Sequence, residues 1–431
     1  MNLTASMDLT PRAFLSSLEL HGVKLGLDNI AHLLDRAGQP HEQFPSVHVA
    51  GTNGKGSVVA MLDAMLMASG YRTGRFTSPH LVDLSERFLL NAKAVDEAEL
   101  DGHIGFYQYA AARMDPPPTY FELVTAVAFR IFATRQVDCA LVEVGMGGRF
   151  DATNVLSPLA TAVTNIDLDH QKYLGDTLEA IAFEKAGIIK PDIPVVIGEE
   201  AAGPQRVLRE RAREVNAPAR VVGRDYQFSI SDGGLHRMFS YESAAFRLEA
   251  VRLGLAGVYQ GENAATSVAL AEMLQPHFPR LNESAVRKGL ENARWPCRLE
   301  RVMDTPAVYI DVAHNTSGAQ HLARELPASV IVLAVSSDKN AEEMIDALGP
   351  AAHQLILTQF TGPRALPVDR LCEAARNWPY LWEPHFDMAI LQGLRLAGTQ
   401  YPLLISGSIF CAGEARRLLV EQHHALPIRF A

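Results

Sequence analysis

The sequence predicts an α/β protein that has a doubly wound, mostly parallel sheet of the P-loop type and a second, smaller Rossmann-like α/β domain. Apolar, strand-like runs alternate with amphipathic helical stretches along most of the 431 residues. A short strand over 47–50 leads into a glycine-rich turn over 51–57 and then into a helix. The alternation breaks at 294–298 and restarts beyond it. We therefore expect one domain over residues 1–296 and a second over 297–431.

The glycine-rich turn has the composition of a phosphate-binding loop. A turn between a strand and a helix N-terminus presents backbone N–H groups and the positive end of the helix dipole to phosphate. Its spacing departs from the usual loop because Gly56 separates Lys55 from Ser57, so an ordinary glycine turn is the alternative. The residue types still fit Lys55 as a charge on the β- and γ-phosphates and Ser57 as a magnesium ligand.

The other elements of the first domain are expected from apolar spacing. Helices are predicted over 11–38 (broken at Gly22 and Gly26), 119–131, 176–187, 263–274 and 283–292, and strands over 71–77, 139–144, 160–164 and 193–197. The run 139–144 is nearly continuously apolar, as in a central parallel strand, and Glu143 lies near its C-terminal end. Because ligands gather at the carboxyl ends of such strands, a metal ligand belongs there.

Two regions complete the predicted organisation. Shorter alternating runs over 218–255, with two adjacent glycines, predict hairpins at the edge of the first sheet. In the second domain, strands over 308–312, 330–335, 354–358 and 403–405 and a helix over 318–325 repeat the α/β pattern.

Composition narrows the class of protein. An apolar content of 48% and a charged content of 20% are those of a soluble globular protein. The net charge of −10 argues against a nucleic-acid or anionic-membrane partner. The four cysteines have no paired spacing, the N-terminus resembles no secretory signal, and no apolar run is long enough to span a membrane. We expect a cytoplasmic monomer that acts on small molecules.

Six motifs occur in order between residues 25 and 414. They are Gly51–Ser57, Ser78–Leu81, Glu143–Asn154, Asp169–His170 with Leu174 and Gly175, Glu184–Gly187, and Asp311–Asn315. Together they resemble the folylpolyglutamate synthase family, which is related to the Mur ligases of cell-wall synthesis. The matches at 78–81 and 143–154 favour the folate branch over the Mur ligases.

The resemblance implies an ATP-dependent ligase that adds L-glutamate to folates and also to dihydropteroate, through an acyl phosphate, with release of ADP and phosphate. Two alternatives are a Mur-type amino-acid ligase and a non-catalytic nucleotide-binding regulator. Intact Lys55, Glu143, His170, Lys185 and Asp311 weigh against a regulator. Barely 50 residues precede the glycine loop, fewer than the extra N-terminal domain of a Mur ligase needs.

The resemblance also assigns roles to residues. ATP contacts are expected from Thr52, Asn53, Gly54, Lys55, Gly56, Ser57, Asn263, Arg298 and Asp311. Two Mg²⁺ ions are expected, one held by Ser57 and Glu143 and the other by His170. Lys55, Lys185 and His314 are the expected catalytic residues, with Lys185 carbamylated. The family has glycine before the arginine, and Cys297 stands there instead, which leaves the local backbone turn open.

The substrate residues are implied in the same way. Folate contacts are expected from Ser78, Pro79, His80, Phe121, Glu122, Arg149 and Asp151, and a contact near the glutamate site from Ser408. Several structural alternatives stay open: Phe121 as core, Asn263 as a helix N-cap, and Lys185 as a simple phosphate contact or ion-pair partner.

Overall fold

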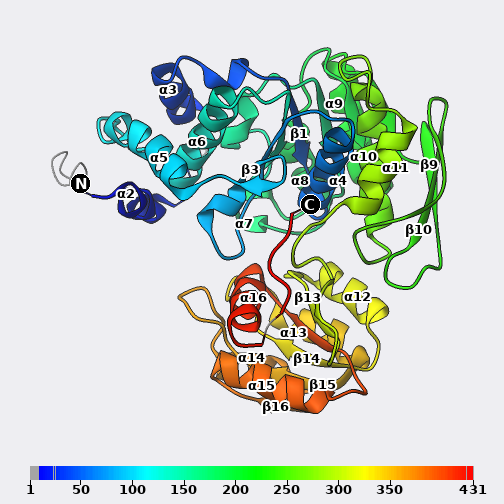
Figure 1. The fold of residues 1–431 in the computed structure, drawn as a ribbon. Coiled ribbons are helices and arrows are strands. Elements are labelled where there is room, and N and C mark those ends of the chain that lie inside the picture. Colours follow the sequence, from blue (N-terminus) through cyan, green and yellow to red (C-terminus); the bar gives the residue numbers. More distant parts are fainter. Residues whose placement is uncertain (1–8, 23, 25, 424, 431) are drawn as a thin grey trace.

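The computed structural model describes residues 9–22, 24, 26–423 and 425–430, and in this part of the chain it has two lobes, each built on its own sheet (Figure 1). The predicted α/β class, with a large first sheet and a smaller second one, is confirmed. None of the described helices combines the length and the apolar character that crossing a membrane requires. Residues 1–8, on which the reading of the N-terminus partly rests, lie outside the described residues.

The first sheet has eight strands in the order β4-β3-β2-β5-β1-β6-β7-β8. The strands from β2 to β8 in this order are parallel, and β3 and β4 add an antiparallel edge. Their bounds are β1 Ser46–Ala50, β2 Thr73–Phe76, β3 Phe88–Leu90, β4 Lys93–Ala94, β5 Cys139–Glu143, β6 Ala160–Val163, β7 Val195–Ile197 and β8 Ala219–Val221. Val49 of β1 pairs with Glu143, so the loop after β1 begins beside that carboxylate.

Helices cover both faces of this sheet. Successive residues of its central strands point to opposite faces, and the residues on both faces are apolar. Val47, Val49 and Leu141 pack against α4, α10 and α11, whereas Ala140 and Val142 pack against α3, α5 and α6. Helices α8 and α9 cover the β6–β8 side. The helices are α2 Pro11–Ser17, α3 Asp28–Arg36, α4 Lys55–Ala68, α5 Glu97–Ala111, α6 Tyr120–Thr134, α7 Gln171–Leu174, α8 Leu178–Ala186, α9 Ala202–Glu214, α10 Gln260–Leu274 and α11 Glu283–Asn292.

The hairpins expected at the edge of the first sheet form a separate sheet instead. Strand β8 closes the first sheet, and the next three strands, β9 Tyr226–Ser231, β10 Met238–Ser243 and β11 Arg247–Arg252, pair with one another in an antiparallel sheet. An isolated bridge joins Tyr226 of β9 to Val222, just after β8. Phe239 and Tyr241 are buried in the core shared with α4 and α10. Burial of one face against a helix, rather than pairing with β8, therefore positions these strands.

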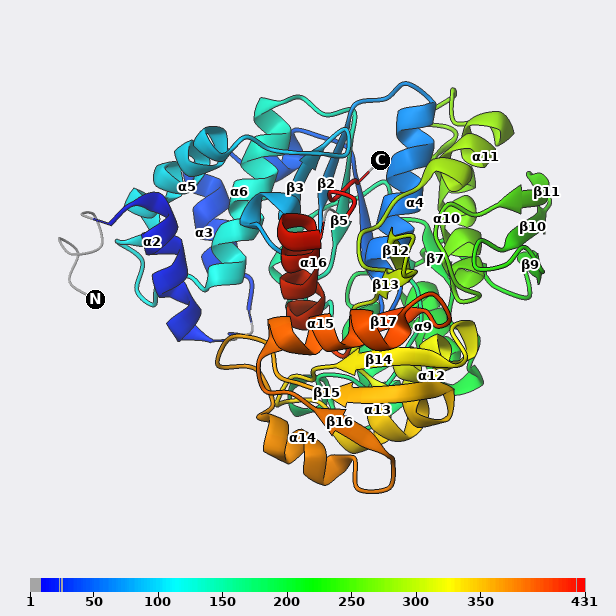
Figure 2. The same cartoon turned by 60° about the horizontal axis from the view of Figure 1, so that its bottom comes forward.

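The second sheet has six strands in the order β12-β13-β17-β14-β15-β16, all parallel except β12. The strands are β12 Glu300–Met303, β13 Val308–Ile310, β14 Ser329–Leu333, β15 Ala352–Leu357, β16 Tyr380–Trp382 and β17 Leu403–Ser406. The helices are α12 Thr316–Glu325, α13 Ala341–Leu348, α14 Val368–Ala374, α15 Phe386–Ala397 and α16 Ile409–His423. Helices α15 and α16 pack on one face and α12, α13 and α14 on the other (Figure 2).

The two lobes touch at α16 and again at the end of the chain. A Cβ atom on Gly413 would overlap the carbonyl oxygen of Leu81, so α16 lies directly on the loop after β2. After α16 the chain returns to the first lobe (Figure 1). The Phe430 ring lies 6.2 Å from the Trp295 ring, and the Arg75 guanidinium lies 5.1 Å from the Trp295 ring and 5.6 Å from the Phe430 ring.

Candidate active site

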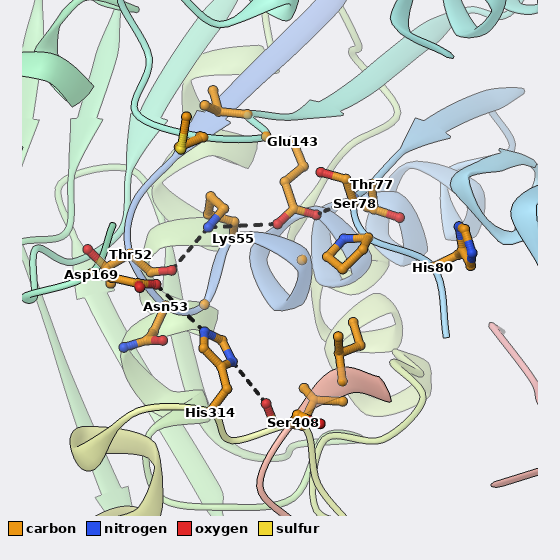
Figure 3. Close-up of a pocket in the computed structure, with 18 of the residues that line it drawn as sticks. Thr52, Asn53, Lys55, Thr77, Ser78, His80, Glu143, Asp169, His314 and Ser408 are labelled. Carbon is orange, nitrogen blue, oxygen red and sulfur yellow. Dashed lines mark hydrogen bonds and ion pairs between the residues drawn. The ribbon is translucent and has the colours of Figure 1, made fainter. Parts of the chain in front are cut away.

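A cavity of about 230 Å³ opens between the lobes, at the carboxyl ends of β1, β2 and β5 (Figure 3). Its walls come from the 51–56 loop, the 77–81 loop, the end of β5 and Lys185 of the first lobe. The second lobe contributes residues after β13, β14 and β17. A cavity at strand carboxyl ends and a domain junction is the usual place for a ligand in an α/β protein.

The loop after β1 is fastened to the neighbouring strand. Helix α4 begins at Lys55, because Gly54 adopts a left-handed φ of 83° that glycine accepts without strain. Thr164, which follows β6, donates a hydrogen bond to the Asn53 carbonyl at 2.6 Å, and the Asn165 side chain accepts from the Asn53 N–H at 2.8 Å. Lys55, Gly56 and Ser57 therefore lie in the first turn of a helix, where free N–H groups point outward.

Lys55 and Glu143 face each other across the cavity. The Lys55 ammonium donates to the carbonyls of Gly51 and Thr52 at 3.1 and 3.0 Å and lies 3.9 Å from the Glu143 carboxylate. The other Glu143 oxygen accepts from the Ser78 N–H at 3.3 Å. Burial raises the pKa of Glu143, and the Lys55 charge opposes that shift. The carboxylate thus joins the glycine loop to the 77–81 loop.

Lys185 lies beside Lys55. It is 4% exposed on α8, and its ammonium donates to the Gly51 carbonyl at 2.8 Å. Burial, followed by the Lys55 charge, lowers the pKa of Lys185 to about 7. A large fraction of Lys185 is therefore a neutral amine near neutral pH, which makes it a nucleophile or a proton acceptor.

Three basic side chains, from both lobes, lie around the Asp169 carboxylate. The Lys339 ammonium lies 2.7 Å from its carboxylate, and one nitrogen each of His170 and His314 lies at 3.7 Å. Burial alone would raise the pKa of Asp169, but these neighbours hold it below its ordinary value. His314 and Lys339 belong to the second lobe, so Asp169 is one place where ion pairs join the lobes, and the 2.7 Å pair of Arg237 with Glu325 is another.

A smaller cavity of about 60 Å³ lies on the other side of the loop and is lined by Asn263, Arg298, Tyr259 and His321. The Tyr259 and His321 rings are stacked with centroids 5.4 Å apart. Arg298 lines both cavities. The alternative reading of Asn263 as an N-cap is wrong, because it lies inside α10 and donates to Gln260 at 2.9 Å.

Cys297, which precedes Arg298, adopts the backbone conformation expected of a glycine at this position. Cys297 has a φ of 55°, in the left-handed region where glycine is the usual residue. Its N–H donates to Glu300 at 3.0 Å, and its side chain is fully buried. The backbone before Arg298 is therefore left-handed despite the change of residue.

The predicted substrate residues of the 78–81 loop line the main cavity, as does Ser408. His80 accepts a hydrogen bond from Arg87 at 2.9 Å, and burial together with the Arg87 charge lowers the pKa of His80 to about 4. The Ser408 hydroxyl accepts from the Cys411 N–H at 3.0 Å at the start of α16.

Five predicted residues do not line either cavity: Phe121, Glu122, Arg149, Asp151 and Asp311. Glu122 accepts from the Thr119 N–H at 2.7 Å and caps α6. Arg149 pairs with Glu184 at 2.7 Å. Each of these side chains already has a local partner, so the folate contacts of the first four and the ATP contact of Asp311 stay predictions.

The other three of these residues also make structural contacts. Phe121 packs against Phe76, with ring centroids 6.0 Å apart. Asp151 accepts from the backbone N–H groups of Met146 and Thr153. Both Asp311 oxygens accept backbone N–H groups at 2.7 Å, and Tyr259 lies 3.4 Å away.

Sequence reasoning missed Lys339, Trp295 and Phe430, which line the main cavity. A Cβ atom on Gly56 would lie 2.7 Å from the Trp295 ring, so this indole packs directly on the glycine loop. Lys339 lies in a polar run just after β14. A polar run at the carboxyl end of a strand indicates a ligand site, so the sequence did contain a signal for Lys339.

The donor set suits a hard divalent cation. No cluster of three or more His, Cys, Asp or Glu side chains arises among the described residues. The Ser57 hydroxyl and the Glu143 carboxylate are hard oxygen donors of the kind that Mg²⁺ takes, together with phosphate oxygens and water. Glu143 accepts one hydrogen bond, from the Ser78 N–H, within the described chain, so lone pairs of its carboxylate remain available to a cation.

Known proteins resemble this chain over nearly its whole length. Residues 49–271 match the Mur ligase middle domain, and residues 297–409 match the glutamate ligase domain of Mur ligases. The dihydrofolate synthase/folylpolyglutamate synthase of Bacillus subtilis is 35% identical over 412 residues, covering 92% of this chain and 96% of that protein.

Solved structures agree with this similarity. E. coli FolC in complex with DHPP and ADP has a TM-score of 0.87 and 30% identity, over 97% of this chain and 99% of that one. A bifunctional folylpolyglutamate synthase/dihydrofolate synthase with Mn, AMPPNP and L-glutamate bound has a TM-score of 0.84 and 29% identity, over 96% and 99%. The chain therefore belongs to the folylpolyglutamate synthase/dihydrofolate synthase family, a branch of the Mur ligases.

Proposed function

We propose that the chain is an ATP-dependent ligase that adds L-glutamate to reduced folates and to dihydropteroate. One observation supports this beyond family membership: a glycine loop with Lys55, the Glu143 carboxylate and the Lys185 amine meet residues of the second lobe in a single cavity. A ligase of this kind needs a phosphate cradle and an amine donor site on opposite walls, and the two lobes supply opposite walls.

The reaction has two balanced steps. A carboxylate oxygen of the pteroyl substrate attacks the γ-phosphorus of ATP, and ADP leaves. The amine of glutamate then attacks the acyl carbon, loses a proton, and inorganic phosphate leaves as the amide forms. Lys55 stabilises the charge of the transferred phosphoryl group, because a fixed cation in a partly dry site lowers the barrier to transfer.

Two magnesium ions belong to the proposal. Ser57 and Glu143 would hold one of them, and His170 a second. The ions supply charge neutralisation for the phosphates. The Ser57 hydroxyl has no hydrogen-bond partner among the described residues and is free to bind an oxygen-seeking cation.

Carbamylation of Lys185 is a further part of the proposal. The nitrogen of a neutral amine attacks the carbon of carbon dioxide, and loss of one proton from that nitrogen gives the carbamate. The lowered pKa of Lys185, about 7, provides that neutral amine, and its burial protects the product from water. The change converts a cation beside Lys55 into an anion, which removes the repulsion between the two lysines.

The location and assembly state follow as expectations. We propose a monomer, because the cavity takes both its walls from one chain. We also propose a cytoplasmic location, where ATP is available. Static light scattering of the purified protein, with and without nucleotide, measures the mass directly, and a dimer mass would refute the monomer.

The decisive experiment measures phosphate release from ATP with dihydropteroate, dihydrofolate and tetrahydrofolate, each with and without L-glutamate. We expect release only when a pteroyl acid and glutamate are both present, and no release with UDP-linked substrates. ATP hydrolysis at equal rates without either substrate would refute the ligase. Activity on tetrahydrofolate but not on dihydropteroate would restrict the function to folylpolyglutamate synthesis.

A further inference from the structure

A third cavity, of about 630 Å³, lies between the β3–β4 hairpin of the first lobe and α16 with the following tail. It adjoins the main cavity, because Glu86 and Phe430 line both. None of the residues predicted from the sequence lies in it. A ligand extending away from the glycine loop past Phe430 would enter this space.

The exposed cations in this third cavity lack ion-pair partners among the described residues. Lys93, Arg417 and Arg429 line it, are exposed, and form no ion pair with any residue that the structure describes. Arg416 also lines it and is completely buried. One Arg416 nitrogen donates to Glu300 at 3.0 Å, whereas Nε and Nη1 have no partner in the described chain. Buried guanidinium donors without acceptors are costly, so an anion at this place would stabilise them.

The acidic residues nearby do not neutralise these cations. The Glu86 carboxylate accepts the backbone N–H groups of Leu81, Val82 and Asp83 at 2.7 to 3.3 Å. The Asp83 carboxylate accepts the backbone N–H of Glu86 in the capping box of the short helix Leu84–Arg87. The third carboxylate in the cavity wall, Glu421, is exposed and forms no ion pair with the described cations. Lys93, Arg417 and Arg429 therefore outnumber Glu421 among the lining side chains that have no ion pair in the described chain, and the cavity keeps an excess of positive charge.

The proposed reaction itself supplies a matching ligand. The carboxylate that accepts the phosphoryl group must lie at the glycine loop in every round, however long the substrate has become. Each added γ-glutamyl unit moves the older part of the substrate further from that loop and leaves one α-carboxylate on the chain. The older part therefore extends into adjoining space and carries a row of negative charges.

We propose that the third cavity binds the α-carboxylates of γ-glutamyl units already present on the substrate. Lys93, Arg417 and Arg429 make contacts at its rim, and Arg416 makes the buried contact. The site rests on the proposed function, because only a ligase that extends its own product has such a substrate. It selects for oligoglutamylated folates over dihydropteroate, which carries a single carboxylate.

The test compares substrates that differ only in tail length. KM is measured for dihydropteroate, tetrahydrofolate and tetrahydrofolate with three γ-linked glutamates, in the wild type and in a Lys93→Ala/Arg417→Ala variant. We expect the ratio of the triglutamate KM to the dihydropteroate KM to rise about tenfold, which equals about 1.4 kcal/mol. The control is Arg370→Ala, because Arg370 is an exposed arginine on α14 outside this cavity, and it leaves the ratio unchanged.

A second measurement separates a tail site from a general anion site. Tri-γ-glutamate peptide should compete with the triglutamate substrate in the wild type and much less in the double variant. Equal competition by inorganic phosphate at the same concentration would overturn the proposal, as would an unchanged KM ratio. Absence of phosphate release with every pteroyl substrate would instead refute the ligase function, so the two failures are distinguishable.

Discussion

Lys55 and Lys185 donate hydrogen bonds to the same acceptor, the carbonyl oxygen of Gly51, at 3.1 and 2.8 Å. Two ammonium groups around one carbonyl repel each other, and burial adds to the cost of the second charge. The lowered pKa of Lys185, about 7, is the result of both effects, with burial the larger.

The first prediction concerns pH. Because Lys185 loses its proton only as the pH rises through about 7, the neutral amine is scarce below pH 6. We expect kcat to fall about tenfold per pH unit below 6 and to level off above 8. A pH–rate profile in a fixed-ionic-strength buffer tests this, and a flat profile between pH 5.5 and 8 would exclude Lys185 as the titrating group.

The second prediction concerns the carbamate. ¹³C NMR of the protein in labelled bicarbonate should show one carbamate signal that is absent in Lys185→Ala and retained in Lys172→Ala, a lysine on α7 outside the cavity. Short carboxylates such as formate should partly restore the activity of Lys185→Ala. No signal in the wild type, together with an unchanged rate after removal of carbon dioxide, means that Lys185 stays unmodified.

The third prediction concerns Lys55 and Glu143, which lie 3.9 Å apart. Lys55→Ala and Glu143→Gln should each lower kcat by about 100-fold or more, because each removes charge stabilisation from phosphoryl transfer. The thermal midpoint should change by only a few degrees, with Lys172→Ala as the control for both assays. A near wild-type rate in either variant would disprove its assigned role.

The fourth prediction concerns a buried ion pair beneath the glycine loop. Asp63 of α4 and Arg75 of β2 lie 3.2 Å apart and are both essentially unexposed. Burial raises the pKa of Asp63 and lowers that of Arg75, so each charge depends on the other. Asp63→Leu or Arg75→Met alone should lower the free energy of unfolding of the first lobe by about 3–5 kcal/mol.

The double variant Asp63→Leu/Arg75→Met provides the control for this pair. Because it leaves no unpaired buried charge, its unfolding free energy should lie much closer to that of the wild type than either single variant does. Chemical denaturation with a probe in the first lobe measures all three. Additive losses in the double variant would show that the two side chains do not interact.

The fifth prediction concerns contact between the lobes. The 2.7 Å ion pair of Lys339 with Asp169 links them, and the lowered pKa of Asp169 keeps this carboxylate ionised throughout the neutral and mildly acidic range. Lys339→Met should increase the radius of gyration in small-angle scattering and raise KM, with Lys339→Arg as the charge-conserving control. Equal scattering curves for Lys339→Met and wild type would exclude this role.

The sequence predicted the central strands well, since buried parallel strands are continuous apolar runs and cannot be mistaken for loops. It missed the helices α5, α9 and α13 to α16 and the short strands β3, β4, β12 and β16. The apolar residues of α15, Phe386, Ala389, Ile390 and Gly393, do have helical spacing, so that signal was present. Strand β16 has three partly or fully exposed residues and gives no such signal.

The site residues were predictable from the sequence only where a motif of neighbouring residues identifies them. Lys55 and Glu143 stand in motifs at strand ends, and position alone points to them. The Asp169–Lys339 contact joins residues 170 positions apart in different lobes, and no local pattern encodes how two lobes dock. Asp311 was predicted as a ligand contact from its place at a strand end, but its carboxylate accepts two backbone N–H groups. The sequence alone does not distinguish a carboxylate that binds a ligand from one that binds the backbone.

The returning tail changes how the lobes can move. The chain passes between them once near Trp295 and again before Phe430, and these two rings lie 6.2 Å apart. Both crossings therefore meet at one place, against the first turn of α4. Displacement in a rotation grows with distance from its centre. If the lobes open by rotating about this place, the glycine loop beside Trp295 moves least, and we expect a bound nucleotide to stay in place while the more distant parts of the cavity separate.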